Sequence, residues 1–572
     1  MPHPALISVP PHAVSRTTGL PLPRRPVAWL VTIGLAMLAV RVVFALRADP
    51  FPDEYLYAWL WSVEPLNFCP HPPGTPLLAA LGMALGGRTG FGLKLMPLIL
   101  GCLPPLLVYL LARSVAAFPR GGDAAPASPV APDPRAVAFW AALFCLATPM
   151  YLAFGALLTP DGTQIVMWSV ALLLTWRALT RAPGRATGWW LGAGVVVGLG
   201  LHVKYMMILY FPPLALCMLV VPAWRAQLRT AGPWLAVAAA GLVFGPLAAL
   251  TEYRQDWPTL RYHLVSRQNA MSPSLGNVAE YQGGHLGMYS PILYPALVAA
   301  LAVAAWRGWR RREPDMAFLG FFGGFMWLFF ASIAVVTERE LNREQWDAPA
   351  YVTAMVALAL LGGRWLASAA DIRARTRRLR LLAAGPVLGL VTIALVSVEV
   401  LTGVFTAAVG EKPLFRGISG WRAMASRADA EFRNLPADRP GFFLASRFSG
   451  ALAYWFHGTA TPRIYTLNHA SSRQYGVEHL LLKHGLSEEN LLAREEGNHA
   501  VYVYVTGSRR VEPENRRKRL LMWFEDAVIP EAGGMVGRCV MVRALRFHHT
   551  DNVIGPDGAM VPFRWADGPA GD

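Results

Sequence analysis

The chain has 572 residues, of which 54% are hydrophobic and 15% are charged, and its mean hydropathy is +0.36. This composition excludes a soluble enzyme, because repeated apolar runs of about 20 residues match a hydrocarbon core of roughly 30 Å. The formal net charge of +16 does not indicate a nucleic-acid partner, since the arginines lie between apolar runs, as in the cytoplasmic loops of membrane proteins.

Residues 1–26 are rich in proline and are expected to form a disordered cytoplasmic segment. The apolar run at 27–46 is too long for a signal-peptide core, so we predict an uncleaved membrane anchor. A shorter, glycine-rich run at 75–86 is expected to be interfacial or re-entrant. Ten further spans are predicted at about 91–117, 136–154, 163–180, 188–203, 205–222, 233–251, 289–305, 315–336, 349–369 and 383–408.

Eleven spans would put every arginine cluster in the cytoplasm and every polar motif on the outer side of the membrane. We therefore predict a helical membrane domain at 27–411 and a soluble, extracytoplasmic α/β domain at 412–572. In the second domain, strand-like runs at 441–446 and 500–506 alternate with charged helical stretches such as 489–496. The chain has no Walker loop and no GxGxxG motif, so a nucleotide-driven motor is not expected.

The segment FPDEYLYAWLWSVEPLNFCPHPPGTP, residues 51–76, directly follows the first span. It begins with two adjacent carboxylates, Asp53 and Glu54, and ends in a rigid turn that starts at His71. Its aromatic residues recur four positions apart, which predicts a helix lying along the membrane interface. The residues alone leave two alternatives open, an interfacial anchor and a substrate site. The aromatic residues are Tyr55, Tyr57, Trp59 and Trp61.

Asp161 lies in the sequence LTPD between two predicted spans. A charge at the bilayer centre costs at least roughly 2.5–3.5 kcal/mol, so an acid here needs a reason. Near the interface the reason can be ordinary, because an acid after a proline turn can cap a helix. The alternative is a polar contact with a substrate.

Lys204 lies in GLGLHVKY at the outer end of a short predicted span. Its ammonium either reaches the outer headgroups or supplies a point charge for a lipid-linked phosphate. Arg267 and Arg447, which are also predicted outside, are further candidates for phosphate binding.

Two aromatic motifs complete the set, DWP at 256–258 and QWDAPAY at 345–351. The first is interpreted as a membrane-belt anchor at Trp257. The second provides Trp346 and Tyr351, which either start a helix at the membrane surface or contact a substrate.

Taken in order, these motifs resemble the bacterial glycosyltransferase 39/83-like family of the GT-C superfamily. Its members include lipid A aminoarabinose transferases, lipopolysaccharide galacturonosyltransferases and, more distantly, protein O-mannosyltransferases. The corresponding sequence motifs of the family are close to DEAYYWLWS…YYDHPP, TPDAP, GLGLLSKYT and NWPAPAY. This chain departs from the pattern at Pro70, which replaces the acid before the HPP turn, and at Glu252, where asparagine is frequent.

The resemblance implies a GT-C type fold and an enzyme that moves a sugar from a polyprenyl-phosphate donor to an acceptor. The acceptor would be lipopolysaccharide or lipid A, another glycolipid, or a protein. The protein would be a multi-pass component of the bacterial inner membrane, with its active site and C-terminal domain facing the periplasm. Its partners would be membrane lipids, the donor and the acceptor, without a cofactor and without nucleic acid.

Such a reaction needs a base for the acceptor hydroxyl and a cation for the phosphate. It needs no acid at the leaving oxygen, because phosphate is a weak base. Direct displacement predicts inversion at the sugar carbon. The resemblance assigns catalysis to Asp53, Glu54 and Asp161, and donor phosphate binding to Lys204. Arg267 and Arg447 are the next candidates for the phosphate, because both are predicted outside. The resemblance assigns substrate binding to Tyr57, Trp61, His71, Trp346 and Tyr351.

The main alternative function is a flippase or transporter for a polyprenyl-linked sugar. A transporter is expected to carry functional polar residues near the middle of the bilayer. Glu399, inside the last predicted span, fits that alternative better than the enzyme, although a carboxyl paired with a neighbouring helix would explain it equally well.

The cysteines and metal motifs give little further information. Cys69 and Cys539 are both predicted on the oxidising side, and a disulfide between them is one alternative. The chain has no CxxC and no HExxH motif, so no metal site is expected.

Overall fold

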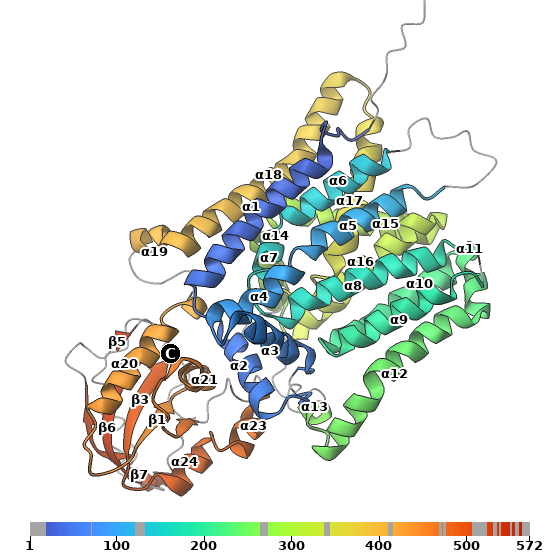
Figure 1. Ribbon diagram of the computed structural model, residues 1–572. Helices are drawn as coiled ribbons and strands as arrows, with labels where there is room; N and C mark the ends of the chain where they lie inside the picture. Colours follow the sequence, from blue (N-terminus) through green and yellow to red (C-terminus); the bar gives the residue numbers. More distant parts are fainter. Residues whose placement is uncertain are drawn as a thin grey trace, which may run out of the picture.

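The computed structural model describes residues 19–562 except 70, 120–131, 183, 263–272, 337–343, 410–415, 468–471, 473–475, 506–522, 530–534, 537–538, 549–551 and 555–559. Figure 1 shows a bundle of long helices next to a smaller α/β domain, with short helices between them.

Six helical segments of the described chain are long and apolar enough to cross a membrane, and two bent helix pairs raise the number to eight. The chain is thus a helical polytopic membrane protein, as predicted. The six are α1 (Pro26–Arg47), α4 with α5 (Gly90–Leu100 and Leu103–Ala116), α12 (Ala231–Arg254), α16 (Pro314–Val336), α17 (Ala350–Ala367) and α18 (Ile372–Thr402). The bent pairs are Tyr205–Val220 with Pro222–Arg229 and Leu275–Tyr289 with Leu293–Arg311.

Each of the eleven predicted spans overlaps a helix, but several helices are short or interrupted. The predicted span at 136–154, for example, divides at Thr148, where Pro149 starts a new helix. The other helices of this part are α2 (Pro52–Val63), α3 (Gly74–Gly86), α6 (Pro134–Leu146), α7 (Pro149–Phe154), α8 (Pro160–Leu179), α9 (Thr187–Leu201), η1 (Tyr205–Tyr210), α10 (Phe211–Val220), α11 (Pro222–Arg225), η2 (Ala226–Arg229), α13 (Pro258–Arg261), α14 (Leu275–Tyr289), α15 (Leu293–Arg311) and α19 (Val404–Val409).

Small residues allow the long helices to approach one another closely. A Cβ added to Gly194 of α9 would lie 2.2 Å from the carbonyl oxygen of Ala236 in α12. One added to Gly320 of α16 would lie 2.1 Å from the backbone nitrogen of Ala305 in α15. Close backbone contact of this kind is a main source of helix association in membranes, where the hydrophobic effect between helices is weak.

The C-terminal domain is built on a mixed sheet with strand order β2-β1-β3-β6-β4, and β5 pairs with β6. β1 runs parallel to β2 and β3, whereas β6 is antiparallel to β3 and β4. Alternate β1 residues face opposite sides, so Phe443 packs in the core that contains α20 and α21, and Phe442 packs in a second core. The strands are β1 (Gly441–Ala445), β2 (Ile464–Thr466), β3 (His499–Val505), β4 (Phe524–Val528), β5 (Met535–Val536), β6 (Cys539–Phe547), β7 (Asn552–Ile554) and β8 (Met560–Pro562). The helices are η6 (Arg416–Ile418), α20 (Trp421–Arg433), α21 (Phe448–His457), α23 (Glu478–Lys483) and α24 (Glu488–Arg494).

Helix α2 exists as predicted, but it is not an anchor exposed to lipid. It lies where the helical bundle meets the α/β domain (Figure 1), and its rings share one hydrophobic core with that domain. Tyr55 and Trp59 are at most 1% exposed. The Tyr55 hydroxyl lies 2.8 Å from Nε2 of His457, whose pKa burial lowers to about 4, so this imidazole is neutral at neutral pH. The four-residue spacing indicated a buried face without saying what covers it, and residues of the α/β domain cover these rings.

Polar contacts fix both ends of α2 to the C-terminal domain. Before the helix, the carboxylate of Asp49 accepts a hydrogen bond from the backbone N–H of Trp421 at 2.8 Å. After it, the carboxylate of Glu64 lies 2.8 Å from Nζ of Lys483 and 3.2 Å from Nε2 of His484. The α/β domain therefore determines where the residues of α2 lie.

Cys69 and Cys539 are not joined by a disulfide, so the alternative of a bridge between them is wrong. The Cys69 thiol instead lies 3.8 Å from the carbonyl oxygen of Gly476.

Candidate active site

Glu54 is the fixed member of the acidic pair on α2. Pro52 starts the helix, where a missing N–H is tolerated, and Glu54 Oε2 accepts a hydrogen bond from the backbone N–H of Phe51 at 2.7 Å. The same oxygen lies 2.9 Å from Nζ of Lys94 on α4, and Oε1 accepts the N–H of Leu158 at 2.8 Å. Glu54 and Lys94 are both completely buried. They tie α2 to α4 and to the loop before α8.

Asp53 is the other member of the acidic pair, and one of its carboxylate oxygens has no hydrogen-bond partner among the described residues. Its Oδ1 is inaccessible to solvent and has no hydrogen-bond partner among them, although the residue as a whole is partly exposed. Burial raises the pKa of Asp53 from 3.8 to about 7, and the negative charges of Glu54 and Asp161 add to the rise. A raised pKa and a free oxygen are properties of a proton acceptor rather than of a structural ion pair.

Asp161 and Lys204 form a buried ion pair, which argues against the ordinary explanation for each residue. Helix α8 is capped by the Thr159 side chain, which accepts the N–H of Gly162, so Asp161 is not the cap. Lys204 is 5% exposed and its Nζ contacts Asp161 Oδ1, so its ammonium does not reach the headgroups. A buried pair of this kind requires both members, because either charge alone would be strongly destabilised.

The chain brings these groups together from three separate segments. The N–H of Gly74 at the start of α3 donates to the carbonyl oxygen of His202 at 2.7 Å, two residues before Lys204. A Cβ at Gly74 would lie 2.5 Å from that oxygen, so the close approach requires glycine. We call Asp53, Asp161 and Lys204 the carboxylate site.

Three predicted substrate-binding residues belong to α2 or the loop that follows it. The rings of Tyr57 and His71 are 6.3 Å apart, which brings the aromatic run and the HPP turn together. Tyr57 is 2% exposed, whereas Trp61 and His71 are partly exposed.

The other two substrate-binding candidates lie in or beside a different cluster. The Trp346 ring packs 6.0 Å from that of Phe330. Tyr351 is completely buried, and its hydroxyl donates to Asp347 Oδ2 at 2.8 Å. Asp347 Oδ1 lies 2.9 Å from Nε2 of His285. We call His285, Tyr289, Tyr294, Asp347 and Tyr351 the tyrosine cluster.

The two arginine candidates receive no support as phosphate ligands. Arg267 lies outside the described residues. Arg447 immediately precedes α21 and is partly exposed.

Glu399, which motivated the transporter alternative, lies in the last turn of α18. Its carboxylate accepts hydrogen bonds from the backbone N–H groups of Phe405 at 2.8 Å and Thr406 at 3.2 Å. It therefore caps the first turn of α19, which is a local structural role.

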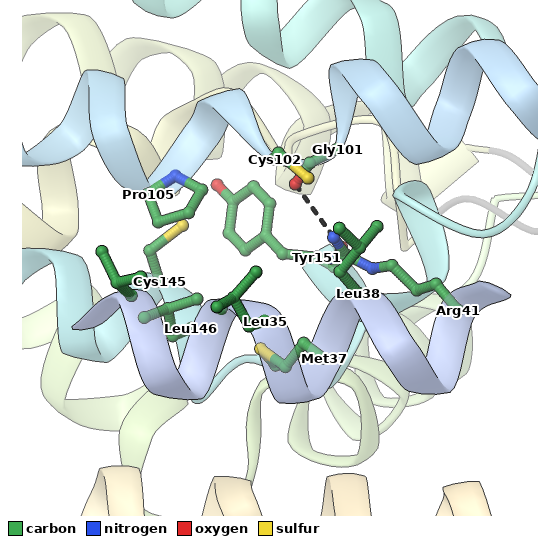
Figure 2. A pocket seen from close by; sticks show the side chains of 12 residues that line it. Leu35, Met37, Leu38, Arg41, Gly101, Cys102, Pro105, Cys145, Leu146 and Tyr151 are labelled. Atoms are coloured by element: carbon green, nitrogen blue, oxygen red, sulfur yellow. Dashed lines mark hydrogen bonds between the residues drawn. The ribbon is translucent and has the colours of Figure 1, made fainter. Parts of the chain in front are cut away.

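Sequence reasoning missed Arg41, a charge inside the first span. Its guanidinium donates to the carbonyl oxygens of Tyr151, Leu152 and Gly101, at 2.6, 3.1 and 3.0 Å, and Figure 2 shows it beside an apolar cavity of about 170 Å³. Two of these oxygens belong to α7, just before the loop that carries Leu158. No predicted site residue lines the cavity.

Lys94 and Gln164 were missed as well. Lys94 could have been found as a charge within an apolar run, the criterion that identified Lys204. Gln164 lies three residues after Asp161, on the same face of α8. Its amide is completely buried, and neither amide atom has a hydrogen-bond partner in the described part of the chain. No group of His, Cys, Asp or Glu side chains suited to a metal occurs within the described ranges.

Comparison with known proteins gives matches to sequence families and to solved structures. Residues 134–249 match the family model described as dolichyl-phosphate-mannose-protein mannosyltransferase. The polyprenol-phosphate-mannose–protein mannosyltransferase of Mycobacterium tuberculosis (strain CDC 1551 / Oshkosh) is 31% identical over 232 residues, covering 36% of this chain and 44% of the relative. The predicted family resemblance is confirmed. The match spans less than half of that relative.

The fold is similar to that of ArnT from Cupriavidus metallidurans. The apo structure has a TM-score of 0.57 at 15% identity and covers 90% of this chain and 98% of its own. The structure bound to undecaprenyl phosphate has a TM-score of 0.59 at 15% identity and covers 90% and 97%. The predicted GT-C type fold with a C-terminal α/β domain is confirmed.

Proposed function

We propose that this chain is a membrane glycosyltransferase that moves a sugar from a polyprenyl phosphate to an acceptor outside the cytoplasm. The observation that carries the proposal is Asp53, whose buried Oδ1 is unpaired within the described residues and whose pKa is raised to about 7. A general base works best when its pKa lies near the operating pH. The segment at 134–249 supports the proposal, because it contains both Asp161 and Lys204.

The donor is proposed from the similar proteins. The mycobacterial relative is named for polyprenol-phosphate-mannose, and ArnT has been crystallised with undecaprenyl phosphate. The acceptor would carry a hydroxyl group and be lipopolysaccharide, another glycolipid or a protein.

In the proposed step, the acceptor hydroxyl gives its proton to Asp53 while its oxygen forms a bond to C1 of the sugar. The bond from C1 to the phosphate oxygen breaks, and polyprenyl phosphate leaves with the electron pair. Phosphate has a second pKa of about 6, so the leaving oxygen needs no acid. Displacement from the opposite face inverts the configuration at C1.

The other site residues take positioning roles around this step. Lys204 would bind the donor phosphate while sharing its charge with Asp161, because the two are paired. Glu54 would hold Asp53 in place through its pair with Lys94. Tyr57, Trp61 and His71 would line the entrance of the substrate, whereas Tyr351 is proposed as a structural residue of the tyrosine cluster.

We also propose that the carboxylate site and the C-terminal domain face the periplasm. Leu482 on α23 is 49% exposed and Ile372 at the start of α18 is 71% exposed. In a variant without native cysteines, Leu482→Cys should react with an impermeant maleimide in intact spheroplasts, and Ile372→Cys only after lysis. The opposite labelling pattern would contradict the orientation.

The experiment that tests the function is a transfer assay in proteoliposomes. Polyprenyl phosphate-mannose, labelled in the sugar, is supplied together with outer-membrane glycolipid or peptide acceptors. A transferase forms a new glycosidic product and releases polyprenyl phosphate. A flippase would instead move the labelled lipid between leaflets without forming any product, and that result would reject the proposal.

A further inference from the structure

Two completely buried polar side chains adjoin the carboxylate site and have no partner among the described residues. Both amide atoms of Gln164 are unpaired, and so is Oγ1 of Thr75; both residues are 0% exposed. Buried polar groups are nearly always hydrogen-bonded, because an unpaired one loses its bonds to water without replacement. An unpaired buried group beside a proposed active site is therefore a candidate for contact with the substrate.

Both side chains lie beside the residues that define the site. Gln164 follows Asp161 by three positions on α8, which places the two on one face of the helix. Thr75 is the second residue of α3, next to Gly74, which bonds to the carbonyl oxygen of His202. Unpaired polar groups therefore occur on α8, one turn from Asp161, and on α3, next to the residue that bonds to the segment carrying Lys204.

We propose that Gln164 and Thr75 form the subsite that binds the hydroxyl groups of the transferred sugar, and that this sugar is uncharged. This inference rests on the proposed function. A primary amide and a hydroxyl each donate and accept hydrogen bonds, which matches the hydroxyl groups of a sugar ring.

The pairing of the neighbouring charges supports an uncharged ring. Lys204 is paired with Asp161, and Lys94 is paired with Glu54. Because Lys204 would also bind the donor phosphate, a sugar carboxylate would find no further cation among these groups and would be repelled by Asp53. A sugar ammonium would have to compete with a lysine for Glu54 or Asp161, or would occupy the Asp53 oxygen that the acceptor hydroxyl needs.

The test compares the binding of two lipids to the purified full-length protein, polyprenyl phosphate and polyprenyl phosphate-mannose. We expect the wild type to bind the sugar-bearing lipid about tenfold more tightly, and Gln164→Met to reduce that ratio to about one. Thr75→Val should reduce it about two- to fivefold. The melting temperature of Gln164→Met should be equal or higher, because an apolar side chain of similar size removes the unpaired amide.

Gln227 provides the matched control. It is 2% exposed, its Oε1 is also unpaired in the described structure, and its amide nitrogen donates to the carbonyl oxygen of Arg181 on a predicted cytoplasmic loop. Gln227→Met should leave the binding ratio unchanged.

The outcomes separate the subsite from the proposed function. If the wild type prefers the sugar-bearing lipid, Gln164→Met abolishes the preference and no transfer is found, the subsite stands and the transferase proposal fails. If the wild type transfers sugar and Gln164→Met keeps the full binding ratio, the subsite is wrong. A wild-type ratio near one also overturns the subsite. Tighter binding of galacturonate- or aminoarabinose-bearing lipid than of the mannose lipid would overturn the uncharged class.

Discussion

The carboxylate site and the tyrosine cluster each contain acids and a nitrogen base. Asp347 of the tyrosine cluster and Asp53 of the carboxylate site differ in whether both carboxylate oxygens are bonded to the protein. Asp347 pairs through Oδ1 with His285 and through Oδ2 with Tyr351. His285 Nδ1 also faces the carbonyl oxygen of Tyr281 at 2.7 Å, so the ring lies between two acceptors. Asp53 has an oxygen that no described group occupies.

The difference shows how structural and chemical uses of an acid can be distinguished. A carboxylate with both oxygens bonded to side chains of its own protein has no oxygen free for a substrate, and it stabilises the fold as part of a closed network. A carboxylate with a raised pKa and an unpaired oxygen destabilises the fold, which is expected where the group is kept for a reaction. The following predictions test that distinction, starting with the largest expected effect on transfer.

Asp53→Asn should lower the transfer rate by about 10²- to 10⁴-fold, because it keeps the shape of the side chain and removes its basicity. Donor binding should be retained, since the carboxylate acts on the acceptor. The measurement is single-turnover transfer in proteoliposomes together with direct donor binding. Near-normal transfer by Asp53→Asn would remove the distinction between the two acids.

Glu54→Gln serves as the control on the same helix. It should act mainly through folding, because it leaves Lys94 buried without its partner, which destabilises a protein by about 3–5 kcal/mol. The double variant Glu54→Gln with Lys94→Met should recover stability and much of the transfer. Full stability with complete loss of transfer in Glu54→Gln would make Glu54 the base instead.

Lys204→Gln should weaken donor binding by about ten- to a hundredfold. This factor corresponds to the roughly 1.5–3 kcal/mol that a hydrogen bond to a charged group contributes. Asp161→Asn is the matched variant, because it breaks the same pair and keeps the cation. If the phosphate binds Lys204, Asp161→Asn should bind donor at least as tightly as the wild type. Equal weakening by both variants would indicate that the pair is only structural.

The pH profile should show the titration of Asp53. Its pKa is raised to about 7, so the carboxylate is protonated below that pH and deprotonated above it. Because the base must be deprotonated, transfer should fall by about thirtyfold between pH 8.5 and pH 5.5 in single-turnover conditions. Asp53→Asn should show no such fall. A wild-type rate that stays constant over this range would contradict the assignment.

The fold and the main motifs could be predicted from sequence because both depend on local patterns. Apolar length gives the membrane helices, and charges between apolar runs identify Asp161 and Lys204. The mutual pairing of those two residues depends on tertiary contacts between α8 and the loop before η1. No sequence spacing indicates such a contact, and each residue alone allowed an ordinary explanation.

The location of α2 is a second case in which the sequence could not predict a tertiary contact. Its aromatic spacing predicts a buried face, and the structure buries that face against α21, a partner that the spacing could not identify. Lys94 and Arg41 were overlooked although each is a charge within an apolar run. The sequence also could not predict that Trp346 and Tyr351 belong to a different cluster from Tyr57 and His71. The order of motifs along the chain does not show which of them lie together in the fold.

The smallest effect on transfer is expected in the tyrosine cluster. Asp347→Asn removes the negative charge between His285 and Tyr351 and should destabilise the protein by about 3–5 kcal/mol, as expected when one partner of a buried pair is removed. Transfer per folded molecule should stay within about twofold of the wild type, because both carboxylate oxygens of Asp347 are bonded to side chains of the cluster. The measurement combines a thermal melt in detergent with transfer normalised to the folded fraction.

Tyr351→Phe is the milder variant of the same cluster. It loses one hydrogen bond to a charged group, so its free energy of unfolding should fall by about 1.5–3 kcal/mol. If Tyr351→Phe keeps full stability and loses transfer, the cluster contacts substrate after all, and a closed hydrogen-bond network is then no guide to a structural role in this protein.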